Sequence, residues 1–331
     1  MSAPSWLRVL ETWSIDPGLS LTLVACGCGY LYGVRRSTHR VRRPHPASRS
    51  THGVRRTHPA SRSTHGVRRG TRAEHAPRRR WPRRRTAAFL AGLAAIALAL
   101  ESGLDGYAEQ MLSIHMVQHL VLILVAAPLL LAGAPLTLAL RTLTPGPRQA
   151  VARVLRGRTI AALSHPATGL AALGAVMLAT HLTPLFELAL TDPTIHVVEH
   201  MLYLASGLLF WSVLIAPGPR TRVLDGLGEV VYLLLGTPLM SVVGVILETD
   251  GVPRYEAYVA PARRLGISAL GDQRLAGALM WVAGTTVMGV IALSVAWRSI
   301  VAEERRAVAR ESYVDQAERT AEPQAGSEAL A

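Results

Sequence analysis

The sequence predicts an all-α polytopic membrane protein with seven transmembrane helices, its N-terminus outside and its C-terminus in the cytoplasm. Half of the 331 residues are hydrophobic and only 17% are charged, whereas ordinary soluble domains carry about 25% charge. The apolar residues form long runs, and about 20 apolar residues suffice for a helix to cross a bilayer. The loops between the runs alternate between arginine-rich and acidic sequence, which sets the predicted orientation.

Seven apolar runs are expected to span the membrane. They are residues 18–34, 86–100, 111–131, 167–188, 194–215, 229–247 and 275–300. An extracytoplasmic N-terminus (1–17) is expected before this transmembrane domain (18–300), and a charged cytoplasmic tail (301–331) after it. The tail is rich in alanine and glutamate, which favours a frayed helix or disorder. Tryptophans near span ends are expected to anchor at the membrane interfaces; they are Trp6, Trp13, Trp211 and Trp297.

Arginine is concentrated in the odd-numbered loops. The first loop, residues 35–85, carries eighteen arginines and one acid, Glu74. Because basic loops remain in the cytoplasm, this loop and the third and fifth are predicted to lie inside. The net charge of +13 therefore comes from one segment. A charge confined in this way gives no reason to expect a nucleic-acid partner.

The twelve histidines divide into two equal groups. Six lie in the first loop, and the other six belong to the helical part of the chain. The predicted topology places five of these at the outer ends of their spans: His115, His119, His181, His196 and His200. The pairs 115/119 and 196/200 each have i,i+4 spacing, so each pair shares one helix face. Two imidazoles at that spacing can bind one metal ion.

Sulfur and carboxylate groups accompany these histidines. Met111, Met116, Met201 and Met280 are predicted in the same layer, and imidazole with thioether suits copper, in particular Cu(I). Glu199 and Asp272 are candidates to orient a histidine by hydrogen bonding. A single buried histidine is more often a polar contact between helices. Two pairs and a fifth histidine at one depth favour a metal site, because polar groups in a bilayer are costly.

Two other chemistries fit parts of the pattern. The stretch "HVVEH" from His196 to His200 matches H-x-x-E-H, a zinc-protease motif in which the glutamate activates water. Its third ligand would be Asp272 or Glu187. Alternatively, His119 and His200 could bind a haem from two sides. Cys26 and Cys28 lie about 200° apart on a helix and cannot hold one ion from one face, so small packing residues are the better interpretation.

Four blocks of sequence carry a family resemblance. They are "HMVQHLVLILVAAPLLLAGAP" (115–135), "THLTPLFELAL" (180–190), "HVVEHMLYLASGLLFW" (196–211) and "GDQRLAGALMWVAG" (271–284). In this order they resemble the signature blocks of the CtaG-type cytochrome c oxidase assembly factors, which are seven-span bacterial membrane proteins. The resemblance covers roughly residues 18–300. The matching positions are His115, His119, His181, His196, His200, Asp272, Met280 and Trp281.

The resemblance implies an accessory factor in the bacterial cytoplasmic membrane, without catalytic activity of its own. It implies that the protein helps to mature haem–copper oxidase, handling copper for the metal centres of the enzyme. The implied partners are cytochrome c oxidase subunits and membrane lipids. An outer histidine site agrees with this role, because copper is commonly handled outside the cytoplasmic membrane.

A repeat interrupts the family pattern. Residues 37–70 contain 13-residue copies of the unit "STHGVRRTHPASR" where family members have a short basic loop. The unit has no apolar periodicity, and a longer loop costs little closure entropy. A dispensable, disordered insertion is therefore expected. The alternatives are association with anionic lipid headgroups and weak metal binding on the cytoplasmic side.

Overall fold

The structure is a computed structural model that describes residues 13–42, 80–215 and 224–321. These residues form helices and their connections, with one isolated bridge between Trp13 and Ser102 and no strand among them. The all-α prediction is confirmed for this part of the chain. Most of the repeat, with the expectations about it, lies outside the described residues, as do positions 1–12 and 322–331.

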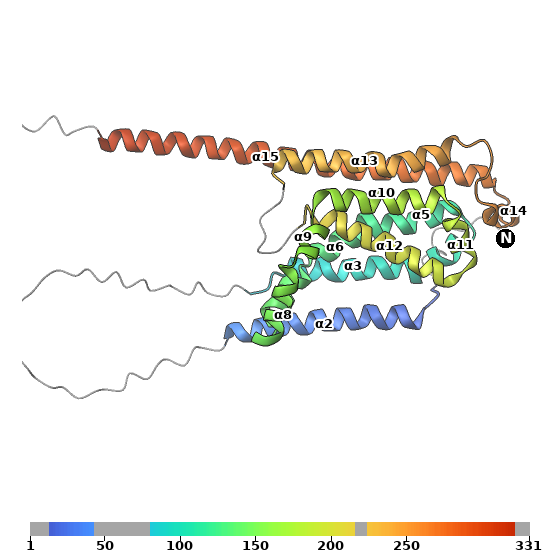
Figure 1. Ribbon diagram of the computed structural model, residues 1–331, viewed down its shortest axis with the longest axis horizontal. Helices are drawn as coiled ribbons and strands as arrows, with labels where there is room; N and C mark the ends of the chain where they lie inside the picture. Colours follow the sequence, from blue (N-terminus) through green and yellow to red (C-terminus); the bar gives the residue numbers. More distant parts are fainter. Residues whose placement is uncertain (1–12, 43–79, 216–223, 322–331) are drawn as a thin grey trace, which may run out of the picture.

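The helices form one bundle whose long members run alongside one another (Figure 1). The first half of the chain supplies α2 (Pro17–Arg42), α3 (Arg83–Glu101), α4 (Gly103–Ala108), α5 (Leu112–Leu120), the π-helix η1 (Val121–Ala126), α6 (Ala127–Ala132), α7 (Pro135–Thr142), α8 (Pro145–Leu155) and α9 (Arg158–Leu163). The second half supplies α10 (Pro166–Leu182), α11 (Leu185–Thr191), α12 (Pro193–Ser212), α13 (Gly226–Thr249), the 3-10 helix η2 (Glu256–Tyr258), α14 (Val259–Leu265) and α15 (Ala269–Ala321). The short helices lie at the two ends of the bundle.

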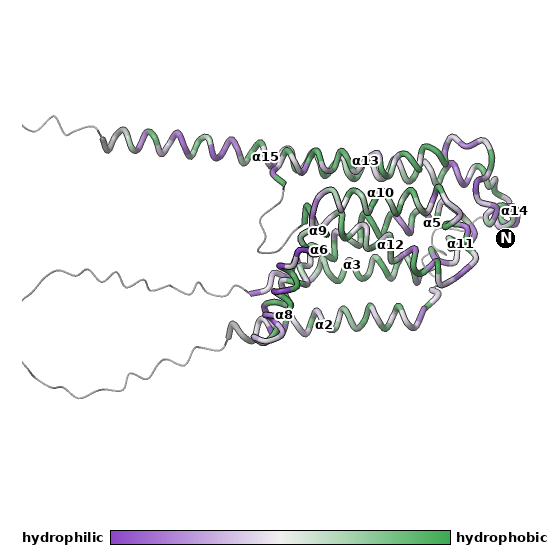
Figure 2. Tube along the Cα trace, viewed as in Figure 1, coloured by the Kyte–Doolittle hydropathy of each residue, from purple (hydrophilic) through white to green (hydrophobic). Residues whose placement is uncertain are grey.

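Several of these helices are long and apolar enough to cross a membrane. Four qualify among the described residues: Pro17–Thr38, Leu112–Thr142, Gly226–Thr249 and Ala269–Ala317. The bent pair α10–α11 would make a fifth. The chain is therefore a helical membrane protein, as Figure 2 also shows by the apolar sequence along its helices. The other two predicted runs correspond to α3, which begins with three arginines, and to α12, which carries two histidines and a glutamate.

The fourth predicted span is not one continuous helix. Residues 167–188 were expected to form a single run, but α10 ends at Leu182 and α11 continues at an angle of 71°. The residue before a proline is pushed out of the helical region, and Thr183 before Pro184 is extended, with φ −124° and ψ 170°. The turn carries α11 across the end of the bundle and buries Phe186 there completely.

Two other expectations need correction. Trp211 was expected at the membrane interface, but its side chain is buried and its Nε1 donates to the carbonyl of Ile123 at 2.8 Å. Ile123 lies in η1, where the π-helical turn replaces the usual backbone hydrogen bonds between residues four apart by bonds between residues five apart. In the tail, residues 301–321 are neither frayed nor irregular, since α15 remains helical to Ala321.

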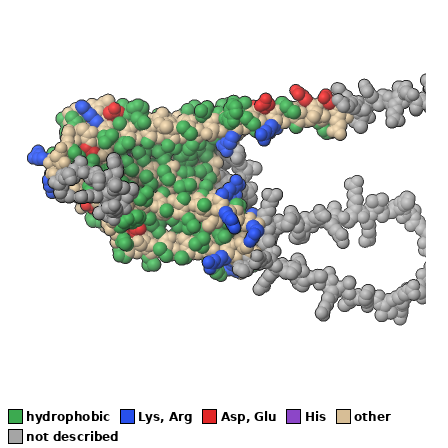
Figure 3. Space-filling view, turned by 180° about the vertical axis from the view of Figure 1, so that it is seen from behind, with side chains coloured by type: hydrophobic (Ala, Val, Ile, Leu, Met, Phe, Trp, Pro, Cys, Tyr) green, Lys and Arg blue, Asp and Glu red, His purple; other side chains and the backbone are tan. Residues whose placement is uncertain are grey.

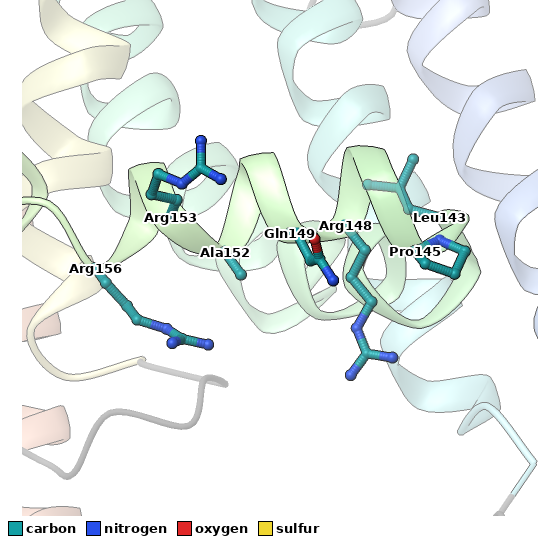
Figure 4. Close-up of a pocket in the computed structure, with 7 residues that line it drawn as sticks. All are labelled: Leu143, Pro145, Arg148, Gln149, Ala152, Arg153 and Arg156. Atoms are coloured by element: carbon teal, nitrogen blue, oxygen red, sulfur yellow. The ribbon is translucent and has the colours of Figure 1, made fainter.

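The two ends of the bundle differ in charge. Figure 3 shows arginine side chains at both ends of the bundle, with acidic side chains among them at one end, while the flanks are mostly apolar. At the other end Figure 4 shows two arginines of α8, and Arg156 directly after it, around a hollow. The hollow is lined by Leu143, Pro145, Arg148, Gln149, Ala152, Arg153 and Arg156. α10 begins at this end and runs to the opposite one, where His181 lies. The arginines of α8 and the helical histidine pairs are therefore at opposite ends of the bundle.

The close packing of α13 on α15 generates a first prediction. A Cβ atom at Gly277 would overlap the backbone oxygen of Gly244 and come within 2.7 Å of the backbone nitrogen of Glu248. Gly277→Ala should therefore destabilise the protein by about 1–3 kcal/mol, the usual cost of overpacking. The measurement is the midpoint of thermal unfolding in detergent. Gly289→Ala on the same helix is the control, because nothing lies within 4 Å of its Cβ position. Equal midpoints for the two variants would contradict this packing.

Candidate metal centre

Three helices bring the predicted histidines together at one end of the bundle. α5 contributes His115 and His119, α12 contributes His196, Glu199 and His200, and α10 contributes His181. Among the described residues, two groups of three could each hold a metal ion: one is His115, His196 and His200, and the other is His115, His119 and Glu199. Within each group the ligand atoms lie within 4.8 Å of one another. His115 belongs to both groups, so the cluster is continuous.

The distances in the cluster are near those of a metal site. The Nε2 atoms of His115 and His119 are 3.1 Å apart, and His115 Nε2 is 3.9 Å from Glu199 Oε2. The ring centroids of His196 and His200 are separated by 4.3 Å. Imidazole nitrogens bind a metal at about 2 Å, so three ligands of one ion stand about 3.5 Å apart. Small side-chain movements would bring either group to that geometry.

The polar atoms of the cluster are buried and mostly unpaired. His115, His119, Glu199 and His200 are all buried, and only His196 is partly exposed. Buried polar atoms normally have hydrogen-bond partners, and an exception calls for an explanation such as a bound ion. The atoms without a partner here are His119 Nδ1, His196 Nε2, His200 Nε2 and both carboxylate oxygens of Glu199. A cation bound by these nitrogens and oxygens would satisfy them, so the donor set fits a metal ion.

A tyrosine sets the orientation of His115. The Tyr258 hydroxyl donates to the carbonyl of Ala108 at 2.9 Å, and it lies 2.9 Å from His115 Nδ1. The hydroxyl has a single proton; if the Ala108 carbonyl accepts it, His115 Nδ1 donates to the hydroxyl, which leaves the lone pair of this ring on Nε2. Burial raises the pKa of Tyr258, so the phenol keeps its proton. Partners of this kind fix the tautomer of a metal-binding histidine, and here the lone pair faces the cluster.

His181 lies beside the cluster and belongs to neither group of three. Its Nδ1 is within hydrogen-bond distance of the Thr180 hydroxyl (2.9 Å), the Met177 carbonyl (3.1 Å) and the Tyr203 hydroxyl (3.2 Å). Its Nε2 is 3.3 Å from the sulfur of Met116. The ring centroid of His181 is 6.5 Å from that of His119. An imidazole–thioether pair therefore adjoins the cluster.

The remaining predicted sulfur ligands are dispersed. Met280 is buried in the same apolar core as Met116, whereas Met201 is 66% exposed. Both cysteines of α2 are exposed rather than packed in the interior. Of these side chains, Met116 contacts a histidine, because its sulfur lies 3.3 Å from His181 Nε2. It is therefore the thioether best placed to act with the cluster.

Asp272 acts on a helix end instead of on a histidine ring. Its carboxylate accepts from the backbone nitrogens of Leu112 (2.6 Å) and Ser113 (3.4 Å) and from the Ser113 hydroxyl. These are donors of the first turn of α5, which lacks a side-chain cap of its own. Asp272 thus positions His115 through the backbone of α5. Glu187 accepts from the backbone nitrogen of Glu256 at 2.8 Å and belongs to neither group of possible metal ligands.

Three aromatic residues near the cluster were missed by the sequence analysis. Tyr203 stacks on the ring of His119 with centroids 3.8 Å apart. Phe186 lies edge-on to His115 at 5.0 Å, and Tyr258 makes the hydrogen bond described above. Tyr203 and Phe186 sit in apolar runs, where an aromatic residue is usual, so only their spacing from the histidines could have indicated them. Tyr258 lies in a loop of mixed charge that gives no such signal.

The fold and the cluster define an α-helical membrane protein with a buried centre rich in histidine at one end of the bundle. The sequence profile described as "Cytochrome c oxidase caa3 assembly factor (Caa3_CtaG)" matches residues 64–301. The chain therefore belongs to the caa3-type cytochrome c oxidase assembly factor family, as its four sequence blocks predicted.

Similar proteins occur in mycobacteria. Uncharacterized proteins of Mycobacterium bovis and Mycobacterium tuberculosis are each 31% identical over 244 residues, which are 70% of this chain and 36% of theirs. One of Mycobacterium leprae is 26% identical over 319 residues, 92% of this chain and 43% of its own. The chain thus spans well under half the length of the curated relatives it matches. No solved structure matches it.

The role of Asp272 generates a second prediction. Asp272→Ala leaves two backbone donors and the Ser113 hydroxyl without their acceptor, and each buried donor left unpaired costs about 1–3 kcal/mol. A lower unfolding midpoint is expected, with faster amide exchange in the first turn of α5. The control is Asp250→Ala, which breaks only an exposed pair with Arg254 at 2.8 Å and should change little. If both variants behave alike, Asp272 does not hold the start of α5.

Proposed function

We propose that this protein assists the assembly of haem–copper cytochrome c oxidase by holding copper destined for the metal centres of the enzyme. Its role is that of an accessory factor and not of a catalyst. Family membership supports the assembly role, and the histidine cluster supports the metal. The observation that carries the proposal is the set of buried, unpaired atoms of His119, His196, Glu199 and His200 around His115, whose Nε2 lies 3.1 Å from His119 Nε2.

The ligand types favour copper among the available metals. Imidazole suits zinc, copper, iron and nickel, whereas thioether sulfur selects Cu(I). Four imidazoles meet in the cluster, and Met116 and His181 present a sulfur and a nitrogen beside it. Tyr203 and Phe186 are fully buried against these rings. An apolar wall of this kind limits water access and strengthens each metal–ligand interaction.

The proposal extends to the membrane topology. Seven spans are assigned to α2, α3, α5–α6, α10, α12, α13 and α15, which run alternately up and down the bundle. The arginines of α8 mark the cytoplasmic end, so the N-terminus lies outside and the C-terminus inside. The cluster then faces the outer side of a bacterial cytoplasmic membrane. Oxidase subunits and membrane lipids are the partners that this placement implies.

The geometry gives less support to the two alternatives. A haem between His119 and His200 would have to separate rings whose centroids are 5.5 Å apart at an interplanar angle of 73°, and displace Tyr203 from the face of His119. In a zinc protease, Glu199 would activate water on a metal held by His196 and His200. Its oxygens group instead with His115 and His119, as a metal ligand would.

Copper binding by the purified protein tests the proposal. Anaerobic competition against a coloured Cu(I) chelator should show binding by the wild-type chain. The double variant His115→Ala/His119→Ala removes the member common to both groups, so its affinity should fall by about 100-fold or more. His165→Ala is the control, because this histidine lies at the arginine end and caps α10. Oxidase activity in cells should follow the same order.

Other results would contradict the proposal. A Soret band with split α and β bands in the purified protein would indicate haem. Full copper binding by Glu199→Gln, together with complete loss of function in cells, would favour the protease. Unchanged copper affinity in the double variant would exclude the cluster as the site.

A further inference from the structure

The cluster contains two overlapping ligand groups. The outer group is His115, His196 and His200, and the inner group is His115, His119 and Glu199. The two groups differ in burial: the outer group includes the partly exposed His196, whereas every member of the inner group is buried.

The outer group is the accessible one. His196 is the only partly exposed member of the cluster. Asp105 and Glu109 act on it electrostatically, and Glu109 is exposed. The side chain of Asp105 is held in place by Gln118, whose Nε2 donates to it at 3.0 Å. Carboxylates around an opening raise the local concentration of cations and speed their association. A cation approaching this end of the bundle would therefore meet His196 first.

The inner group is the better final position for a cation. Three neutral imidazoles leave the charge of a bound ion uncompensated, and an uncompensated charge in an apolar environment is unfavourable. Glu199 supplies a carboxylate that has no hydrogen-bond or close ion-pair partner other than His115, 3.9 Å away. An ion held by His115, His119 and Glu199 is thus both neutralised and buried. The difference in charge between the groups favours movement inward.

The bonding of His115 excludes two separate ions on its two nitrogens. Its Nδ1 is engaged with the Tyr258 hydroxyl at 2.9 Å, so Nε2 is the one atom that it offers to either group. We propose that the cluster is a two-position relay in which a copper ion binds first to the outer group and then passes to the inner group, with His115 bound throughout. This inference rests on the proposed function.

The transfer is a ligand exchange without a redox step. The bonds from copper to His196 and His200 break, and bonds to a His119 nitrogen and a Glu199 oxygen form. Any proton on these two atoms leaves to solvent, as metal binding requires deprotonated ligands. His119 is within reach because its ring centroid is 5.5 Å from that of His200 and 4.5 Å from that of His115.

Rate and affinity measured together test the relay. Cu(I) is delivered anaerobically from a chelator to the full-length protein in detergent, and both the uptake rate and the equilibrium affinity are recorded. His196→Ala should slow uptake by about tenfold, because it removes a contact that stabilises the transition state of copper entry. It should lower the affinity by a smaller factor. Glu199→Gln should do the reverse, lowering the affinity by about tenfold with a smaller effect on the rate. His165→Ala controls for general effects of losing a histidine.

A second variant covers the case in which a substitution disturbs folding. His196→Gln keeps most of the side-chain volume, so its unfolding midpoint should equal that of the wild type. Like His196→Ala, it should lower the uptake rate more than the affinity. If the His196 and Glu199 variants change rate and affinity in the same proportion, the relay is wrong, although copper binding as such stands. Two copper ions per chain would also overturn it. A wild-type protein that takes up no copper overturns both the relay and the proposed function.

Discussion

The burial of three histidines and a glutamate between apolar helices, with a fourth histidine partly exposed beside them, is the constraint on which the rest of the structure depends. Every unpaired polar atom in such a place costs about 1–3 kcal/mol, and several are unpaired here at once. The surrounding residues limit that cost. Tyr258 occupies one nitrogen of His115 and Asp272 holds the start of α5, so the remaining lone pairs face one another. The cluster is thus held in place by contacts of the protein itself, as the proposed metal site requires.

Irregular features of the helices serve the same end. The 71° turn between α10 and α11 brings Phe186 onto the rings of His115 and His181. The π-helical turn of η1 offers a carbonyl to Trp211, which fixes α12 against the helix that carries the other histidine pair. A regular seven-helix bundle would leave both contacts out. The departures from ideal helices therefore lie near the histidine cluster.

The sequence contained enough to predict the class of fold and the convergence of the histidine pairs. Long apolar runs predict a helical membrane protein, and i,i+4 spacing places 115/119 and 196/200 on single faces. The orientation drawn from the arginines of loop 35–85 stays a prediction. The break at Pro184 was not predicted, because average hydropathy does not change where a helix changes direction. Asp272 was expected beside a histidine because it lies at the same depth. Its real partner, Leu112, is 160 residues away in the chain, and such a pairing depends on packing that no local pattern encodes.

The central claim is that copper binds to the imidazole nitrogens of the buried cluster at one end of the bundle. X-ray absorption spectroscopy on the copper-loaded protein tests it most directly, because it reports the ligand atoms themselves. The account predicts the multiple-scattering features of histidine, with two or three nitrogen or oxygen ligands at about 2 Å, and their loss when His115 and His119 are replaced. A spectrum with sulfur ligands alone, or with no imidazole scattering, would contradict the account.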